Sequence, residues 1–582
     1  MRVFAAILLS MSLAALPLLA NDAKDAGTEE SRAATAADKP KETTKSENAI
    51  IESEIQDLRS LVEEQRQELE AQRAALKAQQ LKMEALEEKL VTTPSEPVNT
   101  PVAASPAISA GTSTATVAVT PGTPAATATS AMPPQKSAEF EEQSPLYFKI
   151  GATEFYPLGF MELMNTTRTT NLGGIATTFS GIPFSNTVAG RLSEDRISLQ
   201  YSRIGLRTHS KVGEADVTGY IEADFLGYQP ANAYITTNND TLRLRLYWLD
   251  YRRGKFEILG GQTWTLLNPN RVGVSPMPGD IFYSQDVDPN LQLGLTWLRQ
   301  AGIRFIAHPN DNWAIAVAAE NPEQTLPSSV VVPAAAGTGY ASQFDLMSSN
   351  TSNATAAASP NTPNLHPDII TKIAFDATPG GHQVHFDLAG LFRTFKAVNV
   401  IATPSPITAA DTVYSTTHGG GVAATANVEL VKNLRLITTA FYSDGGARYI
   451  ANTTGPDVVI RPNGTLSPVR AGSGIAGFEY QANPKTMIYG YYSGAYFGKN
   501  YQLTGTTYTG YGFPGSANTN NRYLYEPTFG VHYTFWRNPN YGDLRLLTQY
   551  SYVSRTPWSV ASGAPATAHT SMIYIDMRYD LP

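Results

Sequence analysis

The sequence predicts an all-β transmembrane barrel of sixteen antiparallel strands, preceded by an N-terminal α-helical coiled coil and a disordered linker. Three patterns predict this fold class. Apolar and polar residues alternate in sixteen short runs, the gaps between the runs alternate between short and long, and one heptad pattern lies near the N-terminus. Alternate side chains of a strand point to opposite faces, whereas heptads form the seam of a coiled coil. Together the patterns divide the chain into five segments.

Residues 1–20 have the pattern of a cleavable secretory signal. Arg2 precedes a long apolar run, and small Ala20 ends this run before polar Asn21. A membrane anchor is the alternative, but Pro17 and the small residue at the end favour cleavage. The next segment, residues 21–48, is charged and rich in Ala and Thr without apolar periodicity, so we expect it to be disordered.

Residues 49–91 repeat apolar residues at steps of three and four, which predicts a periplasmic coiled coil. The apolar positions expected at its seam are Ile55, Leu58, Val62, Leu69, Leu76, Met83, Leu86 and Leu90. Gln65, Gln72 and Gln79 share one seam position, where each would meet its copies in a symmetric oligomer and fix the register. We expect a homotrimer. An extended single helix is the alternative, and the sequence leaves the number of helices open.

Residues 92–144 are rich in Pro, Thr, Ala and Ser, which predicts a flexible linker. From residue 145 to residue 582 the composition shifts to Tyr, Phe, Gly, Thr and Asn, and the period becomes two. The stretch "ADVTGYIEADF" is an example, with Val217 and Ile221 on one face and Glu222 on the other. The predicted strands begin near residues 158, 197, 214, 241, 255, 297, 313, 369, 383, 419, 434, 474, 485, 526, 543 and 570.

The gaps between these runs indicate an up-and-down barrel with two unlike ends. Short gaps such as "RRGK" and "TPGGH" alternate strictly with long gaps such as 266–296 and 320–368. Short periplasmic turns and long extracellular loops are typical of outer-membrane barrels, and an even number of strands puts both ends of the barrel in the periplasm. A soluble β-sandwich or adhesin is the alternative, but it does not require this asymmetry. A parity shift near Ser202–Arg203 predicts a β-bulge or a strand end.

The stretch "LRLRL" assigns the two faces of one strand. Arg243 and Arg245 alternate with Leu242, Leu244 and Leu246. An arginine facing lipid near the bilayer midplane costs about 2–4 kcal/mol. We therefore expect the leucines to face lipid and both arginines to face the lumen, where rings of cations attract anions.

Other charged residues share the inward parity. Pore-lining cations are expected at Arg203, Arg243, Arg245, Arg304 and Arg393, and lumen carboxylates at Asp216, Glu222 and Asp224. Further inward charges are Lys372, Asp376, Glu429, Asp576 and Arg578. For each of these charges, a structural salt bridge without effect on selectivity remains open, and the acidic strand could neutralise part of the arginine field.

The long gap 266–296 contains the candidate residues of a loop that narrows the pore: Arg271, Asp280, Asp286 and Asp288. Folding into the barrel and a simple extracellular position both remain open. The histidines closest in sequence are His366, His382 and His385. We interpret these as solvated polar residues rather than metal ligands.

The ordered series "YSRIGLRT", "VTGYIEADFLG", "LRLRLYWLDY", "EILGGQTWTLLNP", "RQAGIRF" and "AVAAENP" resembles the DcaP-like outer-membrane porins. The resemblance covers most of the chain and is strongest over residues 197–322. It implies a homotrimer of sixteen-stranded barrels, a periplasmic coiled coil and uptake of small anions, notably dicarboxylates. By motif matching, Arg203, Arg243 and Arg245 correspond to lumen arginines of the family. The ending "MRYDLP" departs from the usual terminal aromatic residue.

The expected function is passive diffusion of small hydrophilic solutes, with a preference for anions such as carboxylates, through a channel in the outer membrane of a Gram-negative-type bacterium. The net charge of −8 gives no reason to expect nucleic acid. The absence of cysteine excludes disulfides and thiolate metal sites, and we identify no enzyme motif, metal site or cofactor site. A structural or adhesive protein, with the coiled coil as a spacer and the long loops as binding surfaces, is the alternative.

Overall fold

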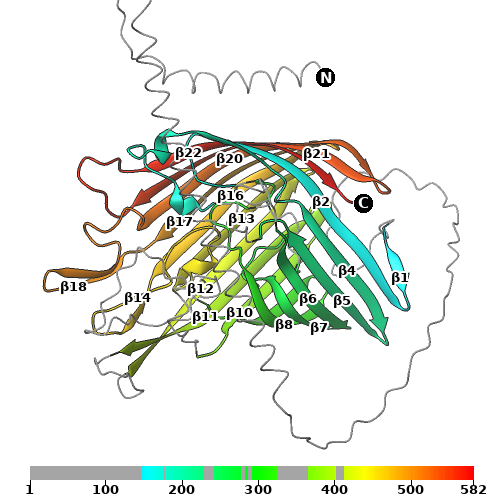
Figure 1. Ribbon diagram of the computed structural model, residues 1–582. Helices are drawn as coiled ribbons and strands as arrows, with labels where there is room; N and C mark the ends of the chain where they lie inside the picture. The colour runs from blue at the N-terminus through cyan, green and yellow to red at the C-terminus, as the bar shows by residue number, and fades with distance from the viewer. Residues whose placement is uncertain are drawn as a thin grey trace, which may run out of the picture. The chain divides into compact units, whose positions relative to one another are not determined.

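A computed structural model describes residues 146–175, 177–227, 241–276, 282–285, 291–323, 365–400 and 412–582 of the protein. The predicted signal peptide, disordered segment, coiled coil and linker lie outside these residues, as do Asp280, Asp286 and Asp288. The described part of the chain forms one large antiparallel sheet that closes on itself (Figure 1).

The sheet contains short segments and long strands. The short segments are β1 (Phe148–Ile150) and β3 (Glu194–Ser198). The long strands are β2 (Thr153–Arg168), β4 (Arg203–Val212), β5 (Ala215–Asp224), β6 (Arg243–Arg253), β7 (Phe256–Trp264), β8 (Arg299–Asn310), β9 (Trp313–Glu320), β10 (Asp368–Ala377), β11 (Val384–Val400), β12 (Thr412–Val431), β13 (Leu434–Asp444), β16 (Arg470–Asn483), β17 (Thr486–Phe497), β20 (Asn521–Asn538), β21 (Gly542–Pro557) and β22 (Ala568–Asp580).

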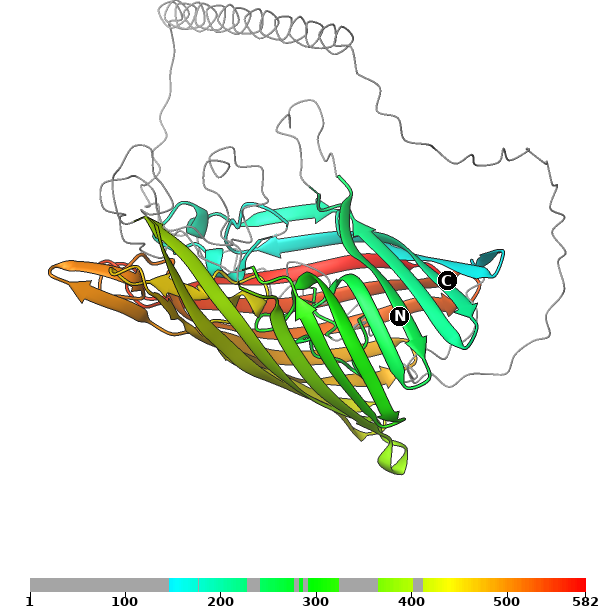
Figure 2. The ribbon, with the colours of Figure 1, turned by 90° about the horizontal axis from the view of Figure 1, so that it is seen from below.

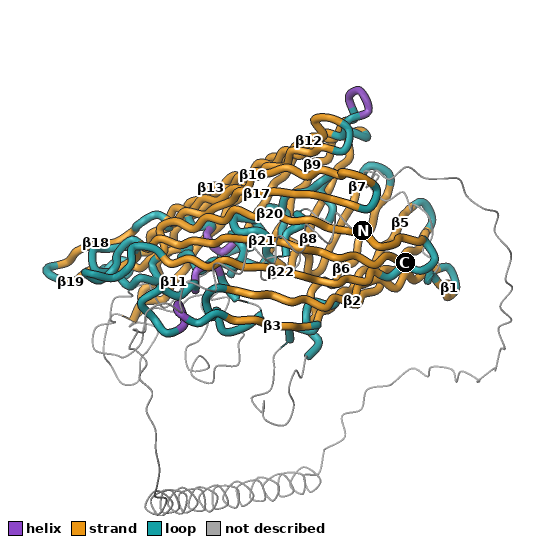
Figure 3. Tube along the Cα trace, turned by 90° about the horizontal axis from the view of Figure 1, so that it is seen from above, coloured by secondary structure: helices purple, strands orange, loops and turns teal. Residues whose placement is uncertain are grey.

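Each long strand pairs with its predecessor, and β22 pairs with β2, so the barrel closes with sixteen strands, as predicted. Figure 3 shows this order across one wall, from β12 through β17, β20 and β22 to β2. β2 pairs with β4 along its first half and with β3 along its second half. The interruption between β3 and β4, from Leu199 to Ser202, lies where the parity shift predicted a bulge or a strand end.

Side chains alternate between the two faces of the wall. On β11, for example, Leu388 is 60% exposed on the outer face, whereas its neighbour Asp387 is buried on the inner face. The exposed outer residues are largely Leu, Ile, Val, Phe and Tyr, and the buried inner residues include many charged groups. An apolar belt around a closed barrel is the surface expected against lipid hydrocarbon.

The two ends of the barrel differ, as the alternation of gap lengths predicted. Tight turns follow β4, β6 and β12, where Gly213, Gly254 and Asn433 adopt positive φ angles of 64°, 57° and 71°. Such angles suit two-residue hairpin turns. At the other end lie the hairpins β14–β15 (Val458–Ile460, Leu466–Pro468) and β18–β19 (Asn500–Thr504, Thr507–Tyr511). Figures 1 and 2 show these hairpins at the end of the barrel opposite the C-terminus.

Helices contribute little to the described residues. Four 3₁₀ turns are present there, each three residues long: η1 (Phe179–Gly181), η2 (Ala189–Arg191), η5 (Pro379–Gly381) and η7 (Ala447–Tyr449). None of the helices in this part of the chain has the length and apolarity that crossing a bilayer requires.

If the exposed belt faces lipid, the loss of stability caused by a charged substitution should depend on the depth of that position in the bilayer. Leu388→Arg in mid-strand should lower the free energy of unfolding in lipid vesicles by about 2–4 kcal/mol. Leu430→Arg, at the end of β12 beside a tight turn, should cost about 1 kcal/mol or less, because the guanidinium reaches the interface. Urea titration of tryptophan fluorescence measures both. Equal costs at the two positions would contradict a lipid-facing belt.

Candidate pore-lining site

Arg243 and Arg245 point to the inner face of the barrel and are paired with the neighbouring acidic strand. Arg243 Nε and Nη2 donate to the two carboxylate oxygens of Asp224 at 2.9 and 2.6 Å. Arg245 Nε donates to Glu222 at 2.8 Å, and its Nη1 donates to Asp224 at 2.6 Å. The side chain of Arg243 is 33% exposed, whereas that of Arg245 is 0% exposed. Arg243 therefore presents charge to the interior, while Arg245 is a buried structural partner.

A β-bulge in β6 corrects one predicted side-chain direction. Leu242 and Leu244 are exposed on the outer face, as expected, but Leu246 is 2% exposed and points inward. The register shifts between Glu222 and Ala223, which leaves Arg245 as an extra residue in β6. An extra residue inverts the parity of everything that follows it. The expectation that Leu246 faces lipid is therefore wrong.

The bulge explains part of the motif "GGQTW", whose role the sequence did not reveal. Gln262 Nε2 donates to the backbone carbonyl of Arg245 at 2.7 Å, at the point where the ladder is disturbed. The guanidinium of Arg245 lies 5.7 Å from the ring centroid of Trp264. Gln262 and Trp264 thus both contact Arg245.

Two further arginines lie on the inner face of β4. Arg203 stands opposite Asp224 in the register, and its guanidinium lies 5.3 Å from the ring centroid of Phe160. Arg207 lies 4.9 Å from the ring centroid of Tyr156. We call the six residues Arg203, Arg207, Arg243, Arg245, Glu222 and Asp224 the arginine cluster. It places four guanidinium groups against two carboxylates on three adjacent strands.

Asp216, the third predicted lumen carboxylate, lies outside this cluster. It occupies the tight-turn end of β5, where its side chain is 42% exposed and lies 3.2 Å from His209 Nε2. No ion pair between Asp216 and an arginine of the cluster is present among the described residues.

Arg304 and Arg393 also point inward, but they are buried. Arg304 is 3% exposed and donates to the Thr263 hydroxyl at 3.0 Å and to the backbone carbonyl of Trp264. Arg393 is 0% exposed and forms ion pairs with Asp368 and Asp457 at 3.4 and 3.2 Å. These contacts fit the structural alternative that the sequence left open for both residues.

The described residues between β7 and β8, which are 265–276, 282–285 and 291–298, fold into the barrel; we call them the inner loop. Arg271 donates to both carboxylate oxygens of Glu479 on β16, at 2.8 and 2.7 Å. Gln292 donates to Glu526 on β20 at 2.9 Å. Gly294 lies so close to the wall that a Cβ there would stand 2.7 Å from the carbonyl oxygen of Gly494. The described residues of this loop therefore contact the inner wall far from β7 and β8.

A charged network fastens the beginning of the inner loop to β10 and β11. Lys372 Nζ donates to the backbone carbonyl of Asn268 at 2.6 Å and lies 3.1 Å from Asp387. His385 bridges Asp376 at 2.8 Å and Asp387 at 3.2 Å. Because His385 is only 2% exposed, our interpretation of it as a solvated residue is wrong. The alternation of the sequence could predict that His385 faces inward, but it could not predict that the inner loop covers this residue.

The fold of this chain is similar to that of solved outer-membrane proteins. The outer membrane channel DcaP of Acinetobacter baumannii matches with a TM-score of 0.52 and 16% identity, over 74% of this chain and 99% of that one. The anion-selective porin from Comamonas acidovorans matches with a TM-score of 0.40 and 10% identity, over 74% and 99% of the two chains. The trimer form of OmpT of Vibrio cholerae matches with a TM-score of 0.38 and 10% identity, over 74% and 100%.

The similarity to DcaP establishes the fold, in agreement with the resemblance of the sequence motifs to the DcaP-like porins. No protein-family model matches this chain. No curated protein sequence is significantly similar to it.

The contact between Arg271 and Glu479 should contribute to seating the inner loop. Arg271→Gln leaves Glu479 buried without its cation, and we expect a loss of about 1–3 kcal/mol in the free energy of unfolding. Adding Glu479→Gln should recover part of this loss, which gives a coupling energy of about 1 kcal/mol or more in a double-mutant cycle.

The exposed pair Arg253–Glu214 provides the control, because its side chains are 64% and 80% exposed. Its cycle should give less than about 0.5 kcal/mol. Strictly additive effects at Arg271 and Glu479, measured by urea titration, would show that this contact does not hold the loop.

Proposed function

We propose that this chain is an outer-membrane porin, a water-filled channel through which small hydrophilic solutes diffuse passively. The observation that carries the proposal is the closed sixteen-stranded barrel with an apolar outer belt and a charged inner face. A barrel of this size is too wide for its own strand side chains to fill. The inner loop would narrow the channel from one side. Its role would be transport without catalysis.

The orientation follows from the two unlike ends. In outer-membrane barrels the short turns face the periplasm and the long loops face outward. Both the start of β2 and the end of β22 lie at the end with the tight turns. The predicted coiled coil, residues 49–91, would therefore lie in the periplasm.

We propose that the channel favours anions such as carboxylates. The exposure of Arg243 in the arginine cluster supports this proposal. Arg243 is 33% exposed while its partner Asp224 is 1% exposed, so the cation and not the carboxylate meets the interior. A guanidinium also matches the geometry of a carboxylate solute. The carboxylate of Asp224 is thus shielded from the interior, whereas the guanidinium of Arg243 is partly open to it.

The double variant Arg203→Gln/Arg243→Gln tests this preference, because Arg245 remains to pair with both carboxylates. We expect the anion-to-cation permeability ratio to fall about thirtyfold, because each charge removed destabilises the passing anion and stabilises the passing cation by similar amounts. Each charge removed at ~8 Å in water changes the energy of a passing ion by about 0.5 kcal/mol. Reversal potentials in a salt gradient across a planar bilayer measure the ratio. Arg253→Gln, at the tight-turn rim, is the matched control and should leave it unchanged.

Two results would overturn these proposals. The absence of ion flux through the reconstituted protein would overturn the channel and favour the structural or adhesive alternative. Selectivity that stays the same in Arg243→Glu/Arg245→Glu would overturn the anion preference while leaving the channel intact.

We further propose a homotrimer, supported by the heptad pattern of residues 49–91. Deletion of residues 49–91 should reduce the trimer band obtained by amine cross-linking in detergent. Deletion of residues 100–142, a segment of equal length within the predicted linker, should leave the band unchanged. A trimer that persists without residues 49–91 would show that the barrel sets the oligomeric state.

A further inference from the structure

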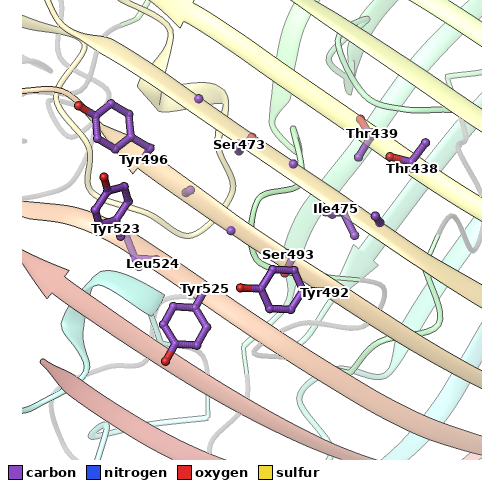
Figure 4. Close-up of a pocket in the computed structure, with 15 residues that line it drawn as sticks. Thr438, Thr439, Ser473, Ile475, Tyr492, Ser493, Tyr496, Tyr523, Leu524 and Tyr525 are labelled. Atoms are coloured by element: carbon purple, nitrogen blue, oxygen red, sulfur yellow. The ribbon is translucent and has the colours of Figure 1, made fainter.

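A groove of about 510 Å³ lies on the wall formed by β13, β16, β17 and β20. Its floor includes Gly472, Gly474 and Gly494, which supply no side chains. Tyrosines line its sides: Tyr492, Tyr496, Tyr523 and Tyr525 (Figure 4). The groove occupies the half of these strands that is closer to the long loops, because β16 begins and β17 ends there.

The groove opens on the outer face of the barrel. Tyr492 is 63% exposed, whereas its strand neighbours Tyr491 and Ser493 are buried on the inner face. Tyr523 is likewise 42% exposed beside buried Leu524. In the membrane location proposed above, this surface meets the outer leaflet and not the lumen. The inference below rests on that location, but not on transport.

Two cations stand at the loop end of the groove. Lys499 Nζ and Arg522 Cζ lie 5.7 and 4.6 Å from the centroid of the same ring, that of Trp558. Trp558 lies 6.2 Å from Tyr496, whose ring forms part of the groove wall. The indole of Trp558 is fixed by a hydrogen bond of 3.0 Å to the carbonyl oxygen of Phe497. The cations therefore adjoin the groove through a chain of aromatic contacts.

Neither cation is neutralised within the described residues. Lys499 is exposed, and no carboxylate there forms an ion pair with Lys499 or Arg522. The Nε of Arg522 is buried without an acceptor in the same part of the chain. Asp444 and Arg470, at the same ends of β13 and β16, are register partners and offset each other. The loop end of the groove thus carries a net positive charge.

We infer that this surface binds a phosphorylated glycolipid of the outer leaflet. The phosphate would lie over Lys499 and Arg522, since a guanidinium can bind phosphate through two parallel hydrogen bonds. An acyl chain would lie along the glycine floor between the tyrosines. The combination argues for this occupant: an apolar groove at membrane depth suits an acyl chain, and unpaired cations at its outer end suit an anionic headgroup.

Native mass spectrometry of the full-length protein in detergent tests the site, with diphosphorylated lipid A as the probe. We expect Lys499→Gln/Arg522→Gln to weaken binding about thirtyfold, because each cation near a membrane surface contributes about 1 kcal/mol. Lys432→Gln removes an exposed cation at the tight-turn end of the barrel. It is the matched control and should bind as the wild type does.

A second variant tests the groove itself. A Cβ at Gly472 would stand 3.4 Å from the nearest atom, the carbonyl oxygen of Phe441, so Gly472→Leu can fold while filling the groove. It should also weaken lipid binding. Dephosphorylated lipid A should bind the wild-type protein more weakly than the diphosphorylated form. Retention of heat-modifiable migration on a gel shows that each variant is folded.

The outcomes separate this inference from its rivals. Equal binding of diphosphorylated lipid A by the wild type and the double cation variant would overturn it. Unchanged lipid binding by Gly472→Leu together with an altered oligomeric state would overturn it in favour of a second copy of this chain. Ion conductance measured on the same samples tests the channel separately, so that failure of one proposal does not conceal the other.

Discussion

The pairing of β22 with β2 is the constraint on which the remaining structure depends. It joins residues more than four hundred positions apart, and it removes the two free edges that an open sheet would expose. In hydrocarbon every backbone donor and acceptor requires a partner inside the protein, so a sheet can cross a bilayer only when it is closed. At this seam Arg578 of β22 and Glu162 of β2 form a buried ion pair at 2.7 Å. An ion pair on the inner face therefore links the two strands that close the barrel.

Closure separates two environments, and loop segments cover part of the inner wall. Once the wall is complete, long segments between strands can cover inward charges that water would otherwise reach. Arg304 and Arg393 illustrate this, because their hydrogen bonds reach backbone carbonyls of loop and strand-end residues. A buried cation requires such partners. The arginine cluster differs because one of its members, Arg243, stays partly open to the interior.

The sequence predicted the strands well, since alternation is a local property of a sheet with one apolar face and one polar face. The prediction failed at the β-bulge, where the extra residue Arg245 turns the side chain of Leu246 to the inner face. Nothing in the residue types around Arg245 marks the position of this bulge. The sequence placed the arginines on the inner face but could not decide how far Glu222 and Asp224 neutralise them. Contacts such as Arg271 with Glu479 join residues 208 positions apart, and they depend on a loop path that periodicity does not encode.

One short stretch of wall connects the inner loop with the outer groove. Gly474 and Gly494 are register partners, and both lack side chains on the outer face. From the inside, Gly294 of the inner loop approaches the same two backbones, and a Cβ at Gly294 would stand 2.7 and 3.0 Å from their carbonyl oxygens. The wall is therefore only one backbone thick at this point. A side chain added outside would fill the groove, whereas one added at Gly294 would push the inner loop away from the wall, so a substitution has a different effect on each side.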